Sequence, residues 1–333
     1  MAETRDDTPT SLGEFGRIGR FLRPLAAGFP GARSLSDDAA LIDCAPGEVL
    51  VVTTDTLVAG VHFIGDEGPA DIAAKALRVN LSDLAGMGAR PVCYTLNLAL
   101  PKMVDDGWLA AFCDGLAADQ AAFDIHLAGG DSVATPGPVT ITVTAFGAVK
   151  PAEALHRDGA RAGDDLWVSG TIGDGLLGLE AARAHGFGDA AAYLIGRYRR
   201  PEPRVALGRV LAGVARAALD VSDGLISDAG HMAAASGLAI GIDCPAVPFS
   251  GAASDILADE PGRLPDLLTG GDDYELLFAA PPGERAAVEA AGRRTDTRVS
   301  RIGRLVAGEV GAVTACDADG SALEFARPGY RHG

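Results

Sequence analysis

Apolar runs that end in acidic or hydroxyl residues recur along this chain. The first is residues 49–52 (Val-Leu-Val-Val), a β-branched run that predicts a short buried strand. It stops at residues 53–56 (Thr-Thr-Asp-Thr), and Gly60 then lets the chain turn before His62. Three later segments repeat the order of apolar run, Asp, and Gly or hydroxyl. Because strands that deliver oxygen ligands at their ends commonly build metal or phosphate sites in α/β proteins, the pattern predicts such a site.

The spacing of apolar residues also predicts the other elements. Strand patterns cover residues 91–100, 125–128, 139–149, 166–169, 217–221 and 274–279. Helical patterns cover residues 12–25, 69–86, 108–122, 201–215, 225–236 and 286–292, and a further helix runs from the glycine-rich turn at 170–175 to 184. We therefore expect an α/β (α+β) protein with two domains, residues 1–150 and 151–333.

The predicted helix over residues 69–86 carries the most informative carboxylate. Small and apolar residues nearly surround this helix, so we expect it to be buried. Asn80, Ser82 and Asp83 nevertheless lie inside that apolar surround. A buried aspartate is costly unless it is paired or bound to a cation, so Asp83 points to a functional site.

Composition narrows the class of protein. Hydrophobic residues make up 48% of the 333, which predicts a folded globular chain. The formal charge of -17 argues against binding nucleic acid through a basic face. Acidity suits a site for several Mg²⁺ ions, although solubility alone also explains it.

The cysteines and the lack of long apolar segments indicate in which cellular compartment the protein is expected. The five cysteines are far apart and form no C-x-x-C pair, so we expect reduced thiols and neither a disulfide framework nor a zinc site. The first nine residues are polar and lack a signal core, and no apolar run reaches about 18 residues. We therefore expect a cytoplasmic protein with no membrane association.

Each motif has a structural explanation beside the functional one. Any single aspartate could cap a helix or shape a turn, but the recurrence after apolar strands favours carboxylates that hold Mg²⁺ around a nucleoside triphosphate. The turn at 170–175 could cradle a phosphate at a helix start, but it matches neither the Walker pattern nor the dinucleotide fingerprint, so an ordinary strand-to-helix turn is favoured. His62 could be structural or could contact substrate, and Arg157 could be a solvated surface residue or a phosphate partner.

Six motifs, taken in order, resemble the thiamine-monophosphate kinase family. They lie at residues 36–40, 53–63, 75–84, 129–132, 219–225 and 270–276, and the resemblance extends from about residue 12 to residue 330. The stretch 53–63 is the most specific part. Ser36 stands where this family commonly has Gly, and Asp272 stands where some relatives carry Glu.

The resemblance implies a two-domain fold like that of aminoimidazole ribonucleotide synthetase, a homodimer built by pairing the N-terminal sheets, and ATP with several Mg²⁺ ions in a cleft. It implies metal ligands or their support at Asp38, Thr53, Thr54, Asp55, Asp83, Asp131, Asp220 and Asp223, of which Asp83, Asp131 and Asp220 are the catalytic set. It implies nucleotide contacts at Gly130, Asp131, Arg157 and Ser222, and substrate contacts at His62, Asp272 and Tyr330.

The implied reaction transfers the γ-phosphoryl group of ATP in line to thiamine monophosphate, giving thiamine diphosphate. The attacking phosphate oxygen is already ionised at neutral pH, so the chemistry needs alignment and charge neutralisation rather than a base. Two alternatives stay open. One is an ATP-dependent ring-closing enzyme of the aminoimidazole ribonucleotide synthetase type, and the other is a non-catalytic nucleotide-binding relative.

Overall fold

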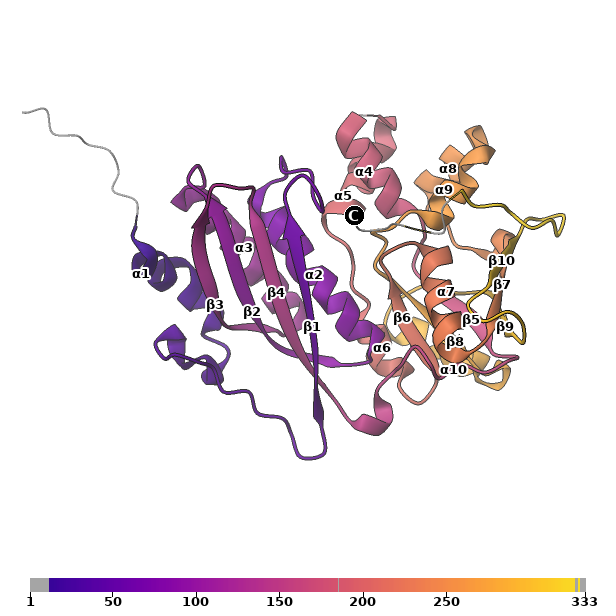
Figure 1. Cartoon of the computed structure of the whole chain (residues 1–333), viewed down its shortest axis with the longest axis horizontal. Coiled ribbons are helices and arrows are strands. Elements are labelled where there is room, and N and C mark those ends of the chain that lie inside the picture. Colours follow the sequence, from indigo (N-terminus) through magenta and orange to yellow (C-terminus); the bar gives the residue numbers. More distant parts are fainter. Residues whose placement is uncertain (1–11, 185, 327–328, 330–333) are drawn as a thin grey trace, which may run out of the picture.

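Two mixed sheets with helices packed against them form the computed structural model, which describes residues 12–184, 186–326 and 329 (Figure 1). The strands are β1 (Val49–Val58), β2 (Arg90–Pro101), β3 (His126–Thr135), β4 (Thr140–Val149), β5 (Asp165–Ser169), β6 (Ala217–Val221), β7 (Ala239–Asp243), β8 (Glu275–Ala280), β9 (Val299–Val306) and β10 (Val313–Cys316). The α-helices are α1 (Glu14–Arg17), α2 (Pro69–Gly86), α3 (Asp106–Phe123), α4 (Asp174–Ala184), α5 (Ala191–Arg199), α6 (Val205–Leu211), α7 (Leu225–Ser236), α8 (Gly251–Asp259), α9 (Leu264–Thr269) and α10 (Arg285–Arg294).

Short helical turns fill several connections between these elements. They are the π-helical η1 (Ile18–Leu22) and the 3-10 turns η2 (Arg23–Ala26), η3 (Pro30–Leu35), η4 (Pro151–Glu153), η5 (Gly188–Ala190), η6 (Cys244–Ala246), η7 (Pro261–Arg263) and η8 (Pro282–Glu284). All five cysteines are unpaired. Among the described helices, none combines the length and the apolar character that a bilayer crossing needs.

The N-terminal sheet has four strands in the order β1-β4-β2-β3, so β1 and β3 are its edges. Helices α2 and α3 pack against each other, and α2 also contacts β1, β2 and β4 (Figure 1). Threonine hydroxyls pair across the neighbouring strands β1 and β4. Thr54 Oγ1 lies 3.0 Å from Thr144 Oγ1. Thr56 Oγ1 lies 2.8 Å from Thr142 Oγ1.

The C-terminal sheet has six strands in the order β10-β7-β9-β5-β8-β6. Only its edge pair β10–β7 is parallel, and the other neighbours are antiparallel. Helix α7 packs on β6, β7 and β8, and every residue of β5, β6 and β8 is buried. The continuous apolar runs that predicted these three strands follow from this burial.

Helix α2 joins the two sheets, because it packs on β1 and β4 and also on β6 and α6. Two glycines permit this close approach. A Cβ on Gly86 would lie 3.3 Å from the amide nitrogen of Asp220 in β6. A Cβ on Gly208 in α6 would lie 2.1 Å from the carbonyl oxygen of Ala85, a clash that real structures do not show. The last turns of α2 therefore lie directly beside β6, which brings Asp83 close to Asp220.

Two predicted strand ends are wrong. Strand β1 continues through residues 53–56 to Val58 and does not stop at Val52. The reason is that threonine is β-branched and these residues pair with β4 in regular register. Strand β3 likewise runs through Gly130 to Thr135, whereas the sequence predicted a strand over residues 125–128. Gly130 has φ of 152°, and a Cβ there would lie 1.8 Å from the Leu96 carbonyl oxygen, so glycine is required inside the strand.

The helical predictions differ mainly in length. The predicted helix over 12–25 is split into α1, η1 and η2, and Pro24, which lacks an amide hydrogen, lies at the start of η2. The helix predicted over 201–215 is confined to α6, which lies between Pro203 and Gly213. Strands β7, β9 and β10 and helices α5, α8 and α9 were not predicted. In these strands glycine, arginine and threonine interrupt the apolar pattern.

Candidate active site

A cavity of about 790 Å³ lies between the N-terminal sheet, α2 and the loops that follow β6 and precede β8. It is lined by eight of the residues predicted as site residues: Thr54, Asp55, His62, Asp83, Asp220, Ser222, Asp223 and Asp272. Segments that are distant in sequence therefore meet at one place.

Asp83 and Asp220 form the acidic centre of the cavity. Thr53 Oγ1 donates to Asp83 Oδ2 at 2.5 Å, and Ser82 Oγ donates to Asp220 Oδ2 at 2.7 Å. Burial raises the pKa of Asp83, although the Thr53 hydroxyl lowers it. Burial and the nearby charge of Asp83 raise the pKa of Asp220 to about 8. Each carboxylate is therefore costly to ionise without a cation beside it.

This donor set fits Mg²⁺. The ion prefers hard oxygen ligands, and the cavity offers carboxylates from Asp55, Asp83 and Asp220. The mutual repulsion between two neighbouring carboxylates is the feature that a divalent cation would relieve. Arg157 contributes a further positive charge, because it lowers the pKa of both Asp83 and Asp220.

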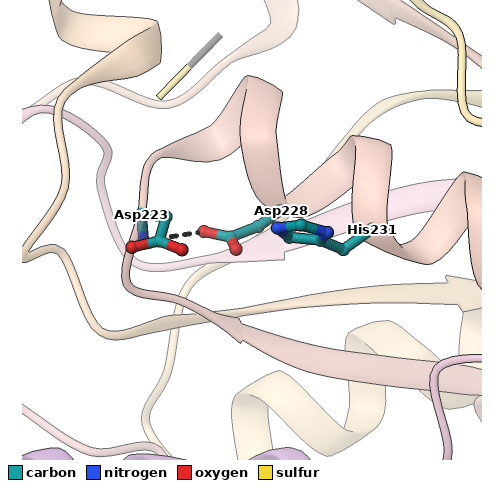
Figure 2. A group of neighbouring side chains, drawn as sticks. All are labelled: Asp223, Asp228 and His231. Atoms are coloured by element: carbon teal, nitrogen blue, oxygen red, sulfur yellow. Dashed lines mark hydrogen bonds between the residues drawn. The ribbon is translucent and has the colours of Figure 1, made fainter. Parts of the chain in front are cut away.

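The loop at residues 222–224 is shaped by an aspartate that the sequence reasoning missed. Asp228 Oδ2 accepts hydrogen bonds from the amides of Ser222 and Asp223, at 3.1 and 3.0 Å. Figure 2 shows Asp228 between Asp223 and His231, and their ligand atoms lie within 4.8 Å of one another. Asp228 is buried in the first turn of α7, and burial together with Asp223 raises its pKa to about 7. Its role is to hold the loop that presents Ser222 and Asp223 to the cavity.

The cavity is lined by another charged group that the sequence analysis left without a role, Lys75. Lys75 Nζ donates to Asp272 Oδ2 at 2.9 Å and lies 3.6 Å from the centre of the Tyr198 ring. The Tyr274 hydroxyl donates to Asp272 Oδ1 at 3.2 Å. Lys75 could have been noticed in the sequence, because a lysine inside a helix predicted to be buried is as unusual as an aspartate there.

Comparison with known proteins identifies the fold and the family. The family model "AIR synthase related protein, N-terminal domain" matches residues 36–149, and "AIR synthase related protein, C-terminal domain" matches residues 161–316. A thiamine-monophosphate kinase from Caulobacter vibrioides is 45% identical over 300 residues, which cover 89% of this chain and 85% of that protein. The chain belongs to the thiamine-monophosphate kinase family.

Solved structures agree with this assignment. The thiamine-monophosphate kinase of Stenotrophomonas maltophilia superimposes with a TM-score of 0.80 at 42% identity, covering 87% of this chain and 91% of that one. The structure of AaThiL complexed with AMPPCP and TMP superimposes with a TM-score of 0.74 at 30% identity, covering 94% of this chain and 95% of that one. The predicted two-domain fold of the aminoimidazole ribonucleotide synthetase type is therefore confirmed.

Other residues that the family resemblance singles out do not line the cavity of this chain. Gly130 and Asp131 are exposed on β3, the edge of the sheet opposite β1. The register places Asp131 beside Asn97, Asn97 beside Thr142, and Thr142 beside Thr56. Three strand spacings, roughly 14 Å, therefore separate Asp131 from the part of β1 that lines the cavity. Their roles stay predictions.

Asp38 and Tyr330 complete the predicted set. Asp38 is exposed and follows η3, which packs against β3. Tyr330 lies outside the described residues. Gly329, however, lines the cavity, and its Cα is so close to the Asp223 carbonyl oxygen that a Cβ there would lie 2.7 Å away.

Asp273 connects the loop that carries Asp272 to the turn at residues 170–175, and it predicts how the stability of the protein depends on pH. Its carboxylate is buried and accepts from the amides of Gly173 and Gly175, at 2.8 and 3.0 Å. Burial nevertheless raises its pKa to about 8, so the folded protein holds a proton there that the unfolded chain releases near pH 4. Its contribution to stability is therefore full below pH 4 and is lost as the pH rises toward 8.

We expect Asp273→Asn to be destabilising at every pH, because the amide cannot accept two N–H groups with two oxygens. The difference in unfolding free energy between the original protein and this variant should shrink from pH 5 to pH 8, by at most about 1.4 kcal/mol per pH unit. Urea unfolding of both proteins at pH 5, 6.5 and 8 measures it. A constant or widening difference would contradict the protonated state of Asp273.

Proposed function

We propose that this protein transfers the γ-phosphoryl group of ATP to thiamine monophosphate, giving thiamine diphosphate and ADP. The observation that carries the proposal is the cavity in which Asp83 from one domain and Asp220 from the other lie close together. The charge of Asp83 raises the pKa of Asp220, and a bound cation would relieve this repulsion. Family membership and a family structure that holds an ATP analogue and TMP support the same substrates.

The residues around the cavity have separate tasks in this proposal. Bound Mg²⁺ ions would neutralise the phosphates and align acceptor and donor for in-line transfer. Thr53, Thr54, Asp55, Asp83, Asp220 and Asp223 would hold these ions or support their ligands. Ser222 and Arg157 would contact the nucleotide phosphates. His62 and Asp272 would contact the acceptor, and the Val58 amide fixes the His62 ring by donating to Nδ1 at 3.1 Å.

No proton acceptor is needed at the attacking oxygen, because a phosphate monoester is ionised at neutral pH. The raised pKa values of Asp83 and Asp220 therefore need not serve acid–base chemistry. They reflect the unfavourable free energy of ionising neighbouring carboxylates in a partly desolvated cavity, which bound cations would offset.

We propose further that two copies of the chain form a homodimer through their N-terminal sheets and that the partner supplies Asp131. Asp131, Gly130 and the segment with Asp38 lie toward the β3 edge, away from the cavity of their own chain. Apolar side chains are also exposed on strands of this sheet, with Val52 at 56% and Val133 at 50%. A sheet with two unpaired edges and exposed valines suits pairing with a second copy. The cytoplasmic location stays a prediction.

The reaction is tested by measuring ADP release from ATP in the presence of Mg²⁺, with and without thiamine monophosphate. Mass spectrometry identifies the product. We expect one thiamine diphosphate per ADP. Turnover only with an aminoimidazole-pathway ribonucleotide would replace the acceptor while keeping the site. ATP or thiamine monophosphate binding without turnover of either acceptor would indicate a binding protein.

A further inference from the structure

Lys75 occupies the point where the two domains meet inside the cavity. It lies on α2, and only 3% of its side chain is exposed. Both groups that compensate its buried charge come from the second domain: the Asp272 carboxylate at 2.9 Å and the Tyr198 ring at 3.6 Å. A buried ammonium without such partners is strongly unfavourable, so the three side chains form one unit.

Lys75 and Tyr274 together fix the orientation of the Asp272 carboxylate. Lys75 holds Oδ2, and the Tyr274 hydroxyl holds Oδ1. The backbone is equally constrained, because Asp272 and Tyr274 have φ of 70° and 52°, a region that side-chain-bearing residues rarely adopt. The Asp272 amide also donates to the Ser222 carbonyl oxygen at 2.9 Å.

Asp272 keeps a part of its carboxylate toward the cavity, with 30% of the side chain exposed. Each carboxylate oxygen has two lone pairs, so one acceptor position on each remains after the bonds to Lys75 and Tyr274. A fixed carboxylate of this kind recognises an N–H donor or a cationic ring, and it repels a phosphate. Thiamine monophosphate carries an aminopyrimidine and a cationic thiazolium ring in addition to its phosphate.

We propose that Lys75 is a positioning residue that sets the affinity for the ring end of the acceptor by holding Asp272 in place. This inference rests on the proposed function and assigns one further residue to the same site. Lys75 itself need not touch the substrate. Its effect passes through the carboxylate that it orients across the boundary between the domains.

Lys75→Met tests the inference, because methionine fills the same space and lacks the charge. We expect the KM for thiamine monophosphate to rise about 10- to 100-fold, the range that a lost charge-assisted hydrogen bond gives. We expect kcat to change less than about threefold and the KM for ATP less than about twofold, since the Lys75 ammonium contacts Asp272 and Tyr198 and neither is assigned to the nucleotide. Lys75→Arg, which keeps the charge, should recover part of the affinity.

Two further variants separate positioning from a purely structural role. Asp272→Asn suits the backbone, because asparagine tolerates positive φ. If Lys75 acts through Asp272, the double variant Lys75→Met/Asp272→Asn should raise the KM no further than Asp272→Asn alone. Lys150→Met is the matched control, since Lys150 is exposed and pairs only with Glu153 in the described part of the chain. It should keep both KM values.

The outcomes distinguish the inference from the function on which it rests. Original protein that does not phosphorylate thiamine monophosphate would overturn the proposed function and this inference together. Normal turnover by the original protein, with an unchanged KM for thiamine monophosphate in folded Lys75→Met, would overturn the inference alone. Equal rises in the KM for ATP and for thiamine monophosphate, with no recovery in Lys75→Arg, would also overturn it and indicate a general structural role.

Discussion

Replacing Asp83 with Asn is expected to lower kcat by about a thousandfold or more while the protein stays folded. Asp83 lies at the acidic centre, and its charge would hold the cations that neutralise the transferring phosphates. Burial raises its pKa, so its ionised form costs folding free energy. A neutral amide removes that cost and can still accept the hydrogen bond from Thr53.

The thermal midpoint of Asp83→Asn without Mg²⁺ should therefore equal or exceed that of the original protein. Adding Mg²⁺ with ADP should raise the midpoint of the original protein and should raise that of the variant much less. Asp114→Asn, on the exposed side of α3, is the control that should leave both turnover and the Mg²⁺ effect intact. Near-normal turnover by folded Asp83→Asn would exclude a cation site built on this carboxylate.

Mixing two inactive variants is expected to restore activity if the partner supplies Asp131. Asp83→Asn and Asp131→Asn should each be inactive as homodimers. In a dimer that contains one chain of each, one site would carry both substitutions and the other site would carry neither. Random assortment makes half of the dimers mixed, so co-expression should recover about a quarter of the original activity.

A second mixture serves as the control. Asp83 and Asp220 line the same cavity of one chain, so mixing Asp83→Asn with Asp220→Asn should leave every site damaged and restore nothing. Tagged copies purified in two steps would give mixed dimers alone, whose expected activity is about half of the original. Absence of recovery in the Asp131 mixture would place all catalytic carboxylates in one chain and remove the proposed role of the dimer.

The sequence determined much of the candidate site because functional aspartates interrupt patterns that are otherwise regular. Asp83 stood out since its helix is apolar on nearly every side, and the structure places that helix between the two sheets. Asp220 belongs to the recurring pattern of an apolar run with an aspartate, and the structure shows that all five residues of its strand are buried. A polar group among apolar neighbours is visible in one dimension, because burial of the neighbours already follows from their chemistry.

Only the tertiary structure decided which of these groups meet. Asp131 follows the same local pattern as Asp55, yet strand order separates it from the cavity of its own chain. The sequence also could not show that residues 53–56 remain in β1, because this depends on pairing with β4. Strand pairing joins segments that are far apart in the chain, so local patterns carry no information about it.

Lys75 and Asp228 are supporting residues whose roles the sequence alone did not reveal. Lys75 acts through Asp272, which is far away in the chain. Asp228 acts through the amides of residues 222 and 223 in the adjoining turn, and these bonds depend on the conformation of that turn. The residue types that can bind Mg²⁺ and phosphate were therefore determined by the sequence. The contact by which Lys75 orients Asp272 was decided by the packing of α2 against the second sheet, because close approach of backbones depends on the whole fold.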